Sequence, residues 1–244
     1  MHIQIRNTIK QAWHLVKGSK RAYFCTFLVL SILQGFLLCV QEEFHHLAPH
    51  ANWPAPAATL LMWFVTAPLT AGFLMMGLQR ARKQAIKWNA GLGYFKAIFP
   101  LFAAYLITML ITWVVMMGTA FLALKLFPLV AHIPFLLTHF WSRIAILALA
   151  VIVICVITAG VNLLFSFNAI LILDQKIPFH KAIVQSVKIS SRAFRSFYGL
   201  IILLGLINLL GAALVGIGLL WTLPLSYISL GLVYESLTAV KTPE

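Results

Sequence analysis

The residues of this sequence that come closest to a chemical site are three neighbouring histidines. His45, His46 and His50 follow directly after Glu42 and Glu43. Imidazole nitrogens and carboxylate oxygens are ligands that zinc, nickel and copper accept, so a divalent metal site at the three histidines is one interpretation. A second interpretation is a pH-sensing role, since histidine side chains titrate near neutral pH. We favour a third, a short hydrated loop that tolerates histidine, because no zinc-enzyme spacing such as His-Glu-x-x-His is present.

Two further histidines, His132 and His139, belong to a later segment that we expect on the same side of a membrane. A metal-dependent membrane enzyme would require His45 or His46 to approach one of them. The sequence has no glycine-rich phosphate loop and no nucleophile elbow. We therefore assign no catalytic residue, and we expect no resident cofactor apart from the open metal alternative.

Three asparagines lie inside apolar stretches, namely Asn162, Asn168 and Asn208. Amides within a membrane usually bond to a neighbouring helix, which is the interpretation that we favour. The alternative is that the three side chains line the cavity of a transporter.

The elements that position these residues follow from the composition. Only 9% of the 244 residues are charged and 62% are hydrophobic, with a mean hydropathy of +0.97. A soluble domain carries about 25% charged residues. High hydrophobicity excludes disorder, and three scattered cysteines exclude a disulfide framework. The sequence predicts an all-α, polytopic membrane protein.

Apolar stretches without Asp, Glu, Lys or Arg predict six membrane-spanning helices of about 20 residues or more. The last stretch, 196–234, is long enough for two crossings, with a reversal at Gly216-Ile217-Gly218, where glycine permits a tight turn. The same triplet of proline, leucine and a hydroxyl residue occurs in two predicted crossings, as Pro68-Leu69-Thr70 and Pro224-Leu225-Ser226. It leaves open whether two hairpins arose by duplication. The predicted crossings are about 22–41, 57–79, 98–124, 144–173, 197–216 and 218–238, all within a single membrane domain, 1–244.

Basic residues predict the orientation. Of the 18 Lys and Arg residues, all but Lys125 and Arg143 fall before the first crossing, after the second or fourth, or in the carboxy-terminal tail. The positive-inside rule then places both termini in the cytoplasm, and cations on every cytoplasmic segment are expected of an inner-membrane protein. Because the cations occur on every inner segment, the net charge of +13 predicts contact with the anionic leaflet and not with nucleic acid.

Two cytoplasmic segments, 1–20 and 175–196, are predicted to be amphipathic helices. In the first, the apolar stripe of Ile5, Ile9, Trp13 and Val16 either lies in the headgroup layer or packs on the bundle. In the second, an apolar face is expected opposite the cations, formed by Phe179, Ile183, Val187 and Phe194. We expect lipid or a partner to bind the cations of both segments: Lys181, Lys188, Arg192, Arg195, Arg6, Lys10 and Lys17.

The carboxy-terminal half carries an ordered set of short motifs. They are Asp174-Gln175-Lys176-Ile177-Pro178, an Ala182-x-x-x-Ser186 step, Gly216-Ile217-Gly218-Leu219-Leu220-Trp221, then Pro224 and Tyr234-Glu235. This order resembles the YciC-like family of bacterial inner-membrane proteins. It is also similar to the membrane domain that precedes some glycerophosphodiester phosphodiesterases. The resemblance implies a six-helix membrane domain without a defined activity, and the histidine loop departs from it.

We expect a non-enzymatic protein of the inner membrane that acts in envelope or membrane organisation through lipid or protein partners, a second copy of the chain included. One alternative is a transporter or permease for a small or lipidic solute. The other is the metal-dependent enzyme that uses the outer histidines.

Overall fold

The chain is built from helices joined by short connections. The computed structural model describes residues 4–47, 54–131, 140–213 and 216–239, and none of these residues forms a β-strand. The predicted all-α fold is confirmed. The helices are α1 (Ile5–Val16), α2 (Lys20–Leu47), α3 (Pro54–Ala81), the 3-10 helix η1 (Ala90–Ala97), α4 (Ile98–Ala131), α6 (Phe140–Leu164), α7 (Asn168–Asp174), α8 (Phe179–Ser191), α9 (Phe194–Ala213) and α10 (Leu219–Thr238).

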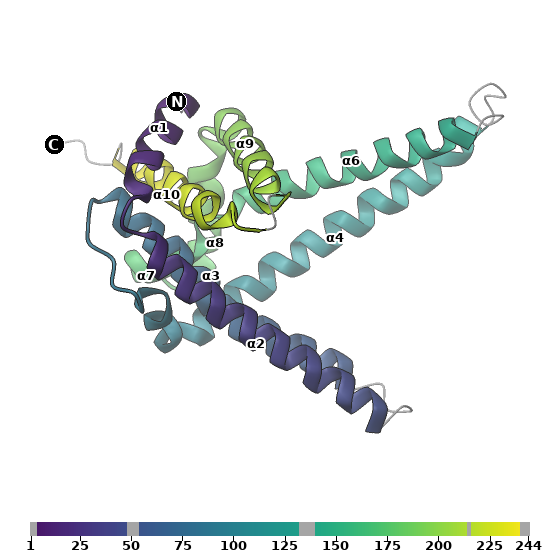
Figure 1. Cartoon of the computed structure of the whole chain (residues 1–244). Helices are drawn as coiled ribbons and strands as arrows, with labels where there is room; N and C mark the ends of the chain where they lie inside the picture. The colour runs from purple at the N-terminus through teal and green to yellow at the C-terminus, as the bar shows by residue number, and fades with distance from the viewer. Residues whose placement is uncertain (1–3, 48–53, 132–139, 214–215, 240–244) are drawn as a thin grey trace.

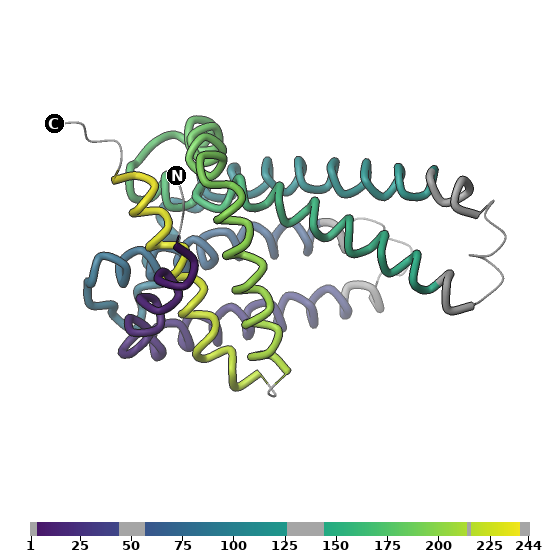
Figure 2. Tube along the Cα trace, turned by 90° about the horizontal axis from the view of Figure 1, so that it is seen from above, coloured from purple at the N-terminus to yellow at the C-terminus, as the bar shows by residue number. Residues whose placement is uncertain are grey.

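Three helical hairpins leave a common base (Figure 1). The α2–α3 and α4–α6 hairpins are long arms that diverge toward separate tips. The α9–α10 hairpin runs across the direction of these arms, as Figure 2 shows, and α1 lies at the base beside the end of α10. The base is therefore where all three hairpins meet.

Five helical segments are long and apolar enough to cross a membrane, and they correspond to the first five predicted crossings. These segments are Lys20–Glu43, Ala57–Ala81, Ala90–Lys125, Ile144–Asp174 and Phe194–Ala213. The predicted sixth crossing, now α10, is not among them, because its proline, serines and tyrosines lower its hydropathy.

The reversal between α9 and α10 falls at the predicted glycines, and Gly216 has a φ of +75° that suits glycine. Its depth differs from the expectation, which placed it at the far side of the membrane. Gly216 and Ile217 line the same groove as Tyr23 and Phe27, which belong to the first turns of α2. The turn therefore lies near the base and not level with the tips of the two arms.

Close contact between α10 and α3 explains this position. A Cβ atom on Gly231 would lie 2.7 Å from the carbonyl oxygen of Gly77, and a Cβ on Gly77 would overlap the carbonyl oxygen of Tyr227. Two helix backbones approach this closely only where side chains are absent. The glycines therefore allow α10 to cross α3 close to the base.

Each hairpin is preceded by a shorter helix that packs on another hairpin. η1 leads into α4–α6 and lies against α2 and α3, whereas α8 leads into α9–α10 and lies against α4, α6 and α7. α1 leads into α2–α3 and lies against α9 and α10, so the sequence of contacts closes into a ring. The duplication suggested by the sequence concerned only two hairpins, whereas all three are preceded by a short helix that packs on another hairpin.

Burial is concentrated at the base. Phe167, Phe197 and Tyr234 are almost completely buried there, and the ring centroids of Phe167 and Phe197 lie 5.2 Å apart in a parallel stack. By contrast, the most apolar 18-residue stretch of Ile144–Asp174 has no residue buried inside the protein. Exposed apolar surface of this extent is rare in soluble proteins and is typical of lipid-facing helices.

Candidate functional site

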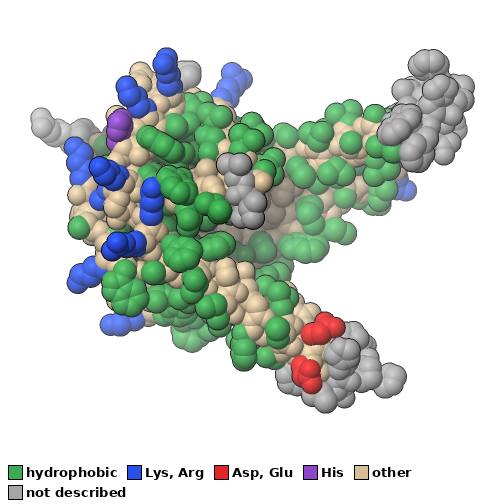
Figure 3. Space-filling model, in the orientation of Figure 1, with side chains coloured by type: hydrophobic (Ala, Val, Ile, Leu, Met, Phe, Trp, Pro, Cys, Tyr) green, Lys and Arg blue, Asp and Glu red, His purple; other side chains and the backbone are tan. Residues whose placement is uncertain are grey.

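Positive charge gathers at the base, and apolar side chains cover the arms (Figure 3). The seven cations proposed to bind lipid or a partner all have exposed side chains there: Lys181, Lys188, Arg192, Arg195, Arg6, Lys10 and Lys17. At the opposite end, Glu42 and Glu43 lie near the tip of the α2–α3 hairpin. The sequence-based separation of the charges is therefore preserved in the folded chain.

The amphipathic helix predicted over 175–196 is shorter in the structure, because α8 ends at Ser191 and Arg195 lies in the first turn of α9. The helix α8 presents three different faces. Its buried face is formed by small and hydroxyl side chains together with one isoleucine: Ala182, Ser186, Ile189 and Ser190. The centre of this face lies about 130° around the helix from Lys181 and Lys188. The predicted apolar face is only partly covered by the protein, since Phe179, Ile183 and Val187 are half-buried and Phe194 is exposed.

The choice of small residues for the buried face of α8 has a simple cause. α8 packs closely on α4, α6 and α7, and a close approach between helices favours small residues over large ones. The larger apolar side chains Phe179, Ile183 and Val187 lie at the edge of the buried face, where they are partly exposed. Alongside the exposed cations they form the kind of surface that suits the boundary between headgroups and acyl chains.

The helix α1 packs on the bundle, which was one of its two predicted arrangements. Ile5 and Ile9 contact the core, and Ala12 and Val16 are buried. Trp13 does not belong to this face, because its side chain is 55% exposed. Arg80 fixes the end of α1 by donating hydrogen bonds to the carbonyl oxygens of Leu15 and Lys17.

An ion network at the base joins one residue from each hairpin. The Arg82 guanidinium donates to Asp174 Oδ1 at 2.6 Å and Oδ2 at 2.9 Å, and its Nε donates to Glu235 Oε1 at 2.7 Å. The hydrogen bond to Asp174 is the main reason that the pKa of Arg82 is raised, so the guanidinium stays charged. Nearby, Gln175 donates to the Tyr234 hydroxyl at 2.9 Å.

The predicted fourth crossing is interrupted. α6 ends at Leu164 and α7 begins at Asn168. Ser186 of α8 is completely buried beside the break, where its hydroxyl donates to the Leu164 carbonyl at 2.8 Å and accepts from the Phe167 amide at 3.2 Å. A backbone break inside an apolar environment persists only when a neighbouring group satisfies it, and Ser186 does so here.

A cavity of about 230 Å³ lies beside this break, between α3, α4, α6 and α7. Two of the three predicted amides, Asn162 and Asn168, line it together with Tyr105, Thr108 and Ser166. Asn168 is only 6% exposed, and its Oδ1 atom has no hydrogen-bond partner within the described chain. A ligand that donates a hydrogen bond would satisfy this oxygen.

The third amide, Asn208, lies apart from the cavity. It donates to Ser226 Oγ at 2.8 Å and so joins α9 to α10, which is the role expected of an amide between membrane helices.

The histidines are not brought into one site by the described residues. The backbone of α2 continues through His45 and His46 to Leu47, whereas His50, His132 and His139 lie outside the described residues. Within the described ranges no three His, Cys, Asp or Glu residues lie close enough to hold a metal. Helix α2 ends at Leu47 and α4 ends at Ala131, at the tips of two diverging hairpins (Figure 1).

Sequence reasoning missed the ion network and Ser186. A signal for the network was present, because the chain has only five acidic residues and two of them, Asp174 and Glu235, end helices on the basic side. Ser186 was noted only as part of the Ala182-x-x-x-Ser186 step, and its role at the helix break could not be predicted, since its partners are backbone atoms 19 and 22 residues away.

No family model, curated protein or solved structure matches the chain. The resemblance to YciC-like proteins therefore stays a prediction.

Proposed function

We propose that this chain is a non-enzymatic membrane protein that binds anionic phospholipid at its basic base and organises the lipid around its hairpins. The proposal places it in the inner membrane of a bacterium with both termini in the cytoplasm. Long apolar helices support its place in a membrane. The observation that carries the lipid assignment is the surface formed by α8, by Arg192 directly after it and by the first turn of α9.

On that surface, exposed cations lie beside apolar side chains that are only half-buried. Lys188, Arg192 and Arg195 would contact lipid phosphates, while Ile183 and Val187 would contact the upper part of the acyl chains. Each such cation contributes about 1 kcal/mol of attraction to an anionic leaflet. Three of them together correspond to a preference of about a hundredfold for anionic over zwitterionic lipid.

The test uses the full-length protein in nanodiscs that contain equal amounts of phosphatidylglycerol and phosphatidylcholine. Native mass spectrometry after gentle extraction counts which lipid stays bound. We expect Lys188→Glu/Arg192→Glu/Arg195→Glu to lower the retained phosphatidylglycerol at least tenfold. The matched control, Lys188→Arg/Arg192→Lys/Arg195→Lys, keeps the charge and should retain the lipid. If the reversed variant keeps its lipid, the stripe binds a protein and the proposal is wrong.

A second candidate function, passage of a small neutral solute, is favoured by the cavity at the helix break. Interrupted helices beside polar side chains are typical of transporter binding sites. The cavity would present Asn162 and Asn168 to a solute, and the absence of a charged side chain among its lining residues argues for an uncharged one.

Efflux of glycerol and urea from proteoliposomes, followed by light scattering, tests this candidate. Asn168→Leu should abolish any flux that depends on the protein. Asn208→Leu, which changes an amide outside the cavity, should not. Absence of flux above that of empty liposomes would exclude both solutes as substrates.

A further inference from the structure

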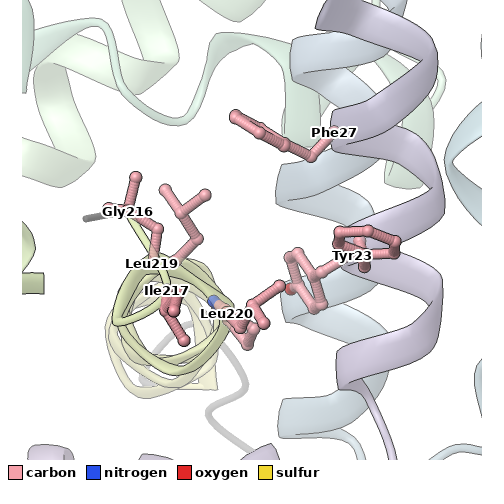
Figure 4. Close-up of a pocket in the computed structure, with 9 residues that line it drawn as sticks. Tyr23, Phe27, Gly216, Ile217, Leu219 and Leu220 are labelled. Carbon is pink, nitrogen blue, oxygen red and sulfur yellow. The ribbon is translucent and has the colours of Figure 1, made fainter. Parts of the chain in front are cut away.

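A second hollow, an apolar groove of about 360 Å³, lies between α2 and the turn that joins α9 to α10. Figure 4 shows Phe27 extending from α2 toward α10, and Leu220 extending from α10 toward Tyr23. The lining also includes Phe24, Ile217 and Leu223. This volume lies within the range of pockets that bind small molecules.

The groove offers no free polar side chain among the residues that line it. Its one hydroxyl belongs to Tyr23, which is 2% exposed and donates to the carbonyl oxygen of Phe73 at 3.4 Å. An apolar hollow without polar partners does not hold water well, so its natural occupant is a hydrocarbon chain.

The floor of the groove is rigid. The Tyr23 ring stacks on Phe73 and Tyr227 with centroid distances of 5.9 and 6.0 Å, and Phe73 and Tyr227 stack on each other at 5.2 Å. Three mutually stacked rings resist collapse into the hollow. The groove is therefore a preformed site.

A cation lies at one end of the groove. The Lys20 ammonium lies 4.3 Å from the ring centroid of Trp221, which is the residue next to Leu220. On α2, Lys20 precedes Tyr23, Phe24 and Phe27 by three, four and seven residues, so all four side chains lie on one face of the helix. From the base outward, that face changes from charged to apolar over about 10 Å.

We propose that this groove binds one acyl chain of an anionic phospholipid whose phosphate is held by Lys20. An ammonium group has three donors, so the contact with Trp221 leaves donors for phosphate oxygens. The charge and the apolar surface occur in the order in which a phospholipid of the basic-side leaflet presents its phosphate and chain. This inference deepens the proposed lipid-binding function and depends on the membrane orientation given there.

The test uses phosphatidylglycerol with a diazirine on one acyl chain, reconstituted with the full-length protein and activated by light. Peptide mapping should find the label on residues 23–27 and 217–223. Lys20→Gln should lower this labelling at least threefold, and Ile217→Trp, which fills the groove from an exposed position, should abolish it. Lys125→Gln is the matched control, because Lys125 also stacks on an aromatic ring, that of Phe121, but lies far from the groove near the end of α4.

Two results would overturn the inference. They are equal labelling by diazirine phosphatidylcholine and undiminished labelling of Ile217→Trp. The charge-reversed variant Lys188→Glu/Arg192→Glu/Arg195→Glu separates this site from the proposed function. It should lose most of its retained phosphatidylglycerol and still be labelled in the groove, so either result can fail without the other.

Discussion

Arg82 binds Asp174 through two parallel hydrogen bonds, although the two residues are 92 positions apart in the sequence. Arg82 follows α3 and Asp174 ends α7, so this pair fastens the first long hairpin to the second. Glu235 of α10 pairs with the same guanidinium and brings in the third hairpin. One arginine therefore connects all three at the base.

Loss of this connection should weaken the fold. Asp174→Asn removes the charge that makes the paired hydrogen bonds strong, and we expect a loss of about 1 kcal/mol because the Arg82 side chain is 36% exposed and therefore partly screened. Thermal unfolding in detergent should show a midpoint lower by about 2–4 °C. Lys83→Ala, a change in the neighbouring cation, should leave the midpoint unchanged. An Asp174→Asn midpoint equal to that of the wild type would show that the pair adds nothing to stability.

The crossing of α3 and α10 should tolerate no side chain. Gly77→Ala would push a methyl group into the carbonyl of Tyr227, which we expect to cost about 1–3 kcal/mol through overpacking. Gly118→Ala on α4 is the matched control, since a Cβ there meets nothing within 4 Å. The control should be neutral or stabilising by up to about 1 kcal/mol, because alanine is the better helix former. Unfolding midpoints in detergent compare the two, and equal values would contradict the close crossing.

Ser186 should be essential to the break between α6 and α7. Ser186→Ala leaves the buried Phe167 amide and Leu164 carbonyl without their shared partner, at a cost of about 1–3 kcal/mol. Hydrogen exchange at the Phe167 amide should also become faster. The control is Ser191→Ala, which changes an exposed serine that bonds only within its own helix. Slow exchange at Phe167 in Ser186→Ala would mean that another group satisfies the break.

The cysteines report on the membrane. Cys39 of α2 and Cys155 of α6 are exposed on the protein surface and are not joined in a disulfide. If Cys39 and Cys155 contact lipid, a charged maleimide should fail to label them in intact membranes and should react once the protein is denatured in detergent. Lys188→Cys at the base provides the positive control for the charged reagent. Rapid labelling of Cys155 by the charged reagent would show that α6 is in water.

Several features of the fold follow from local sequence. Composition alone predicts the membrane class, because the apolar stretches without charged residues are each at least as long as a bilayer crossing, whatever their neighbours are. The reversal at Gly216 is equally local, since a positive φ is a property of a single residue. The position of α8 was predicted, but its buried face was not, because the small residues facing α4 and α6 are selected by a contact with distant helices.

The sequence by itself determined that the chain is helical, apolar and basic at one end, since each of these properties is summed over neighbouring residues. Only the tertiary structure decided that α10 crosses α3 near the base, that α6 breaks beside a polar cavity, and that Arg82 meets two of the five acidic residues. These features depend on pairs of residues far apart in the chain. Their contacts form only when the hairpins pack, because hydropathy specifies which surfaces avoid water and leaves open which surfaces meet.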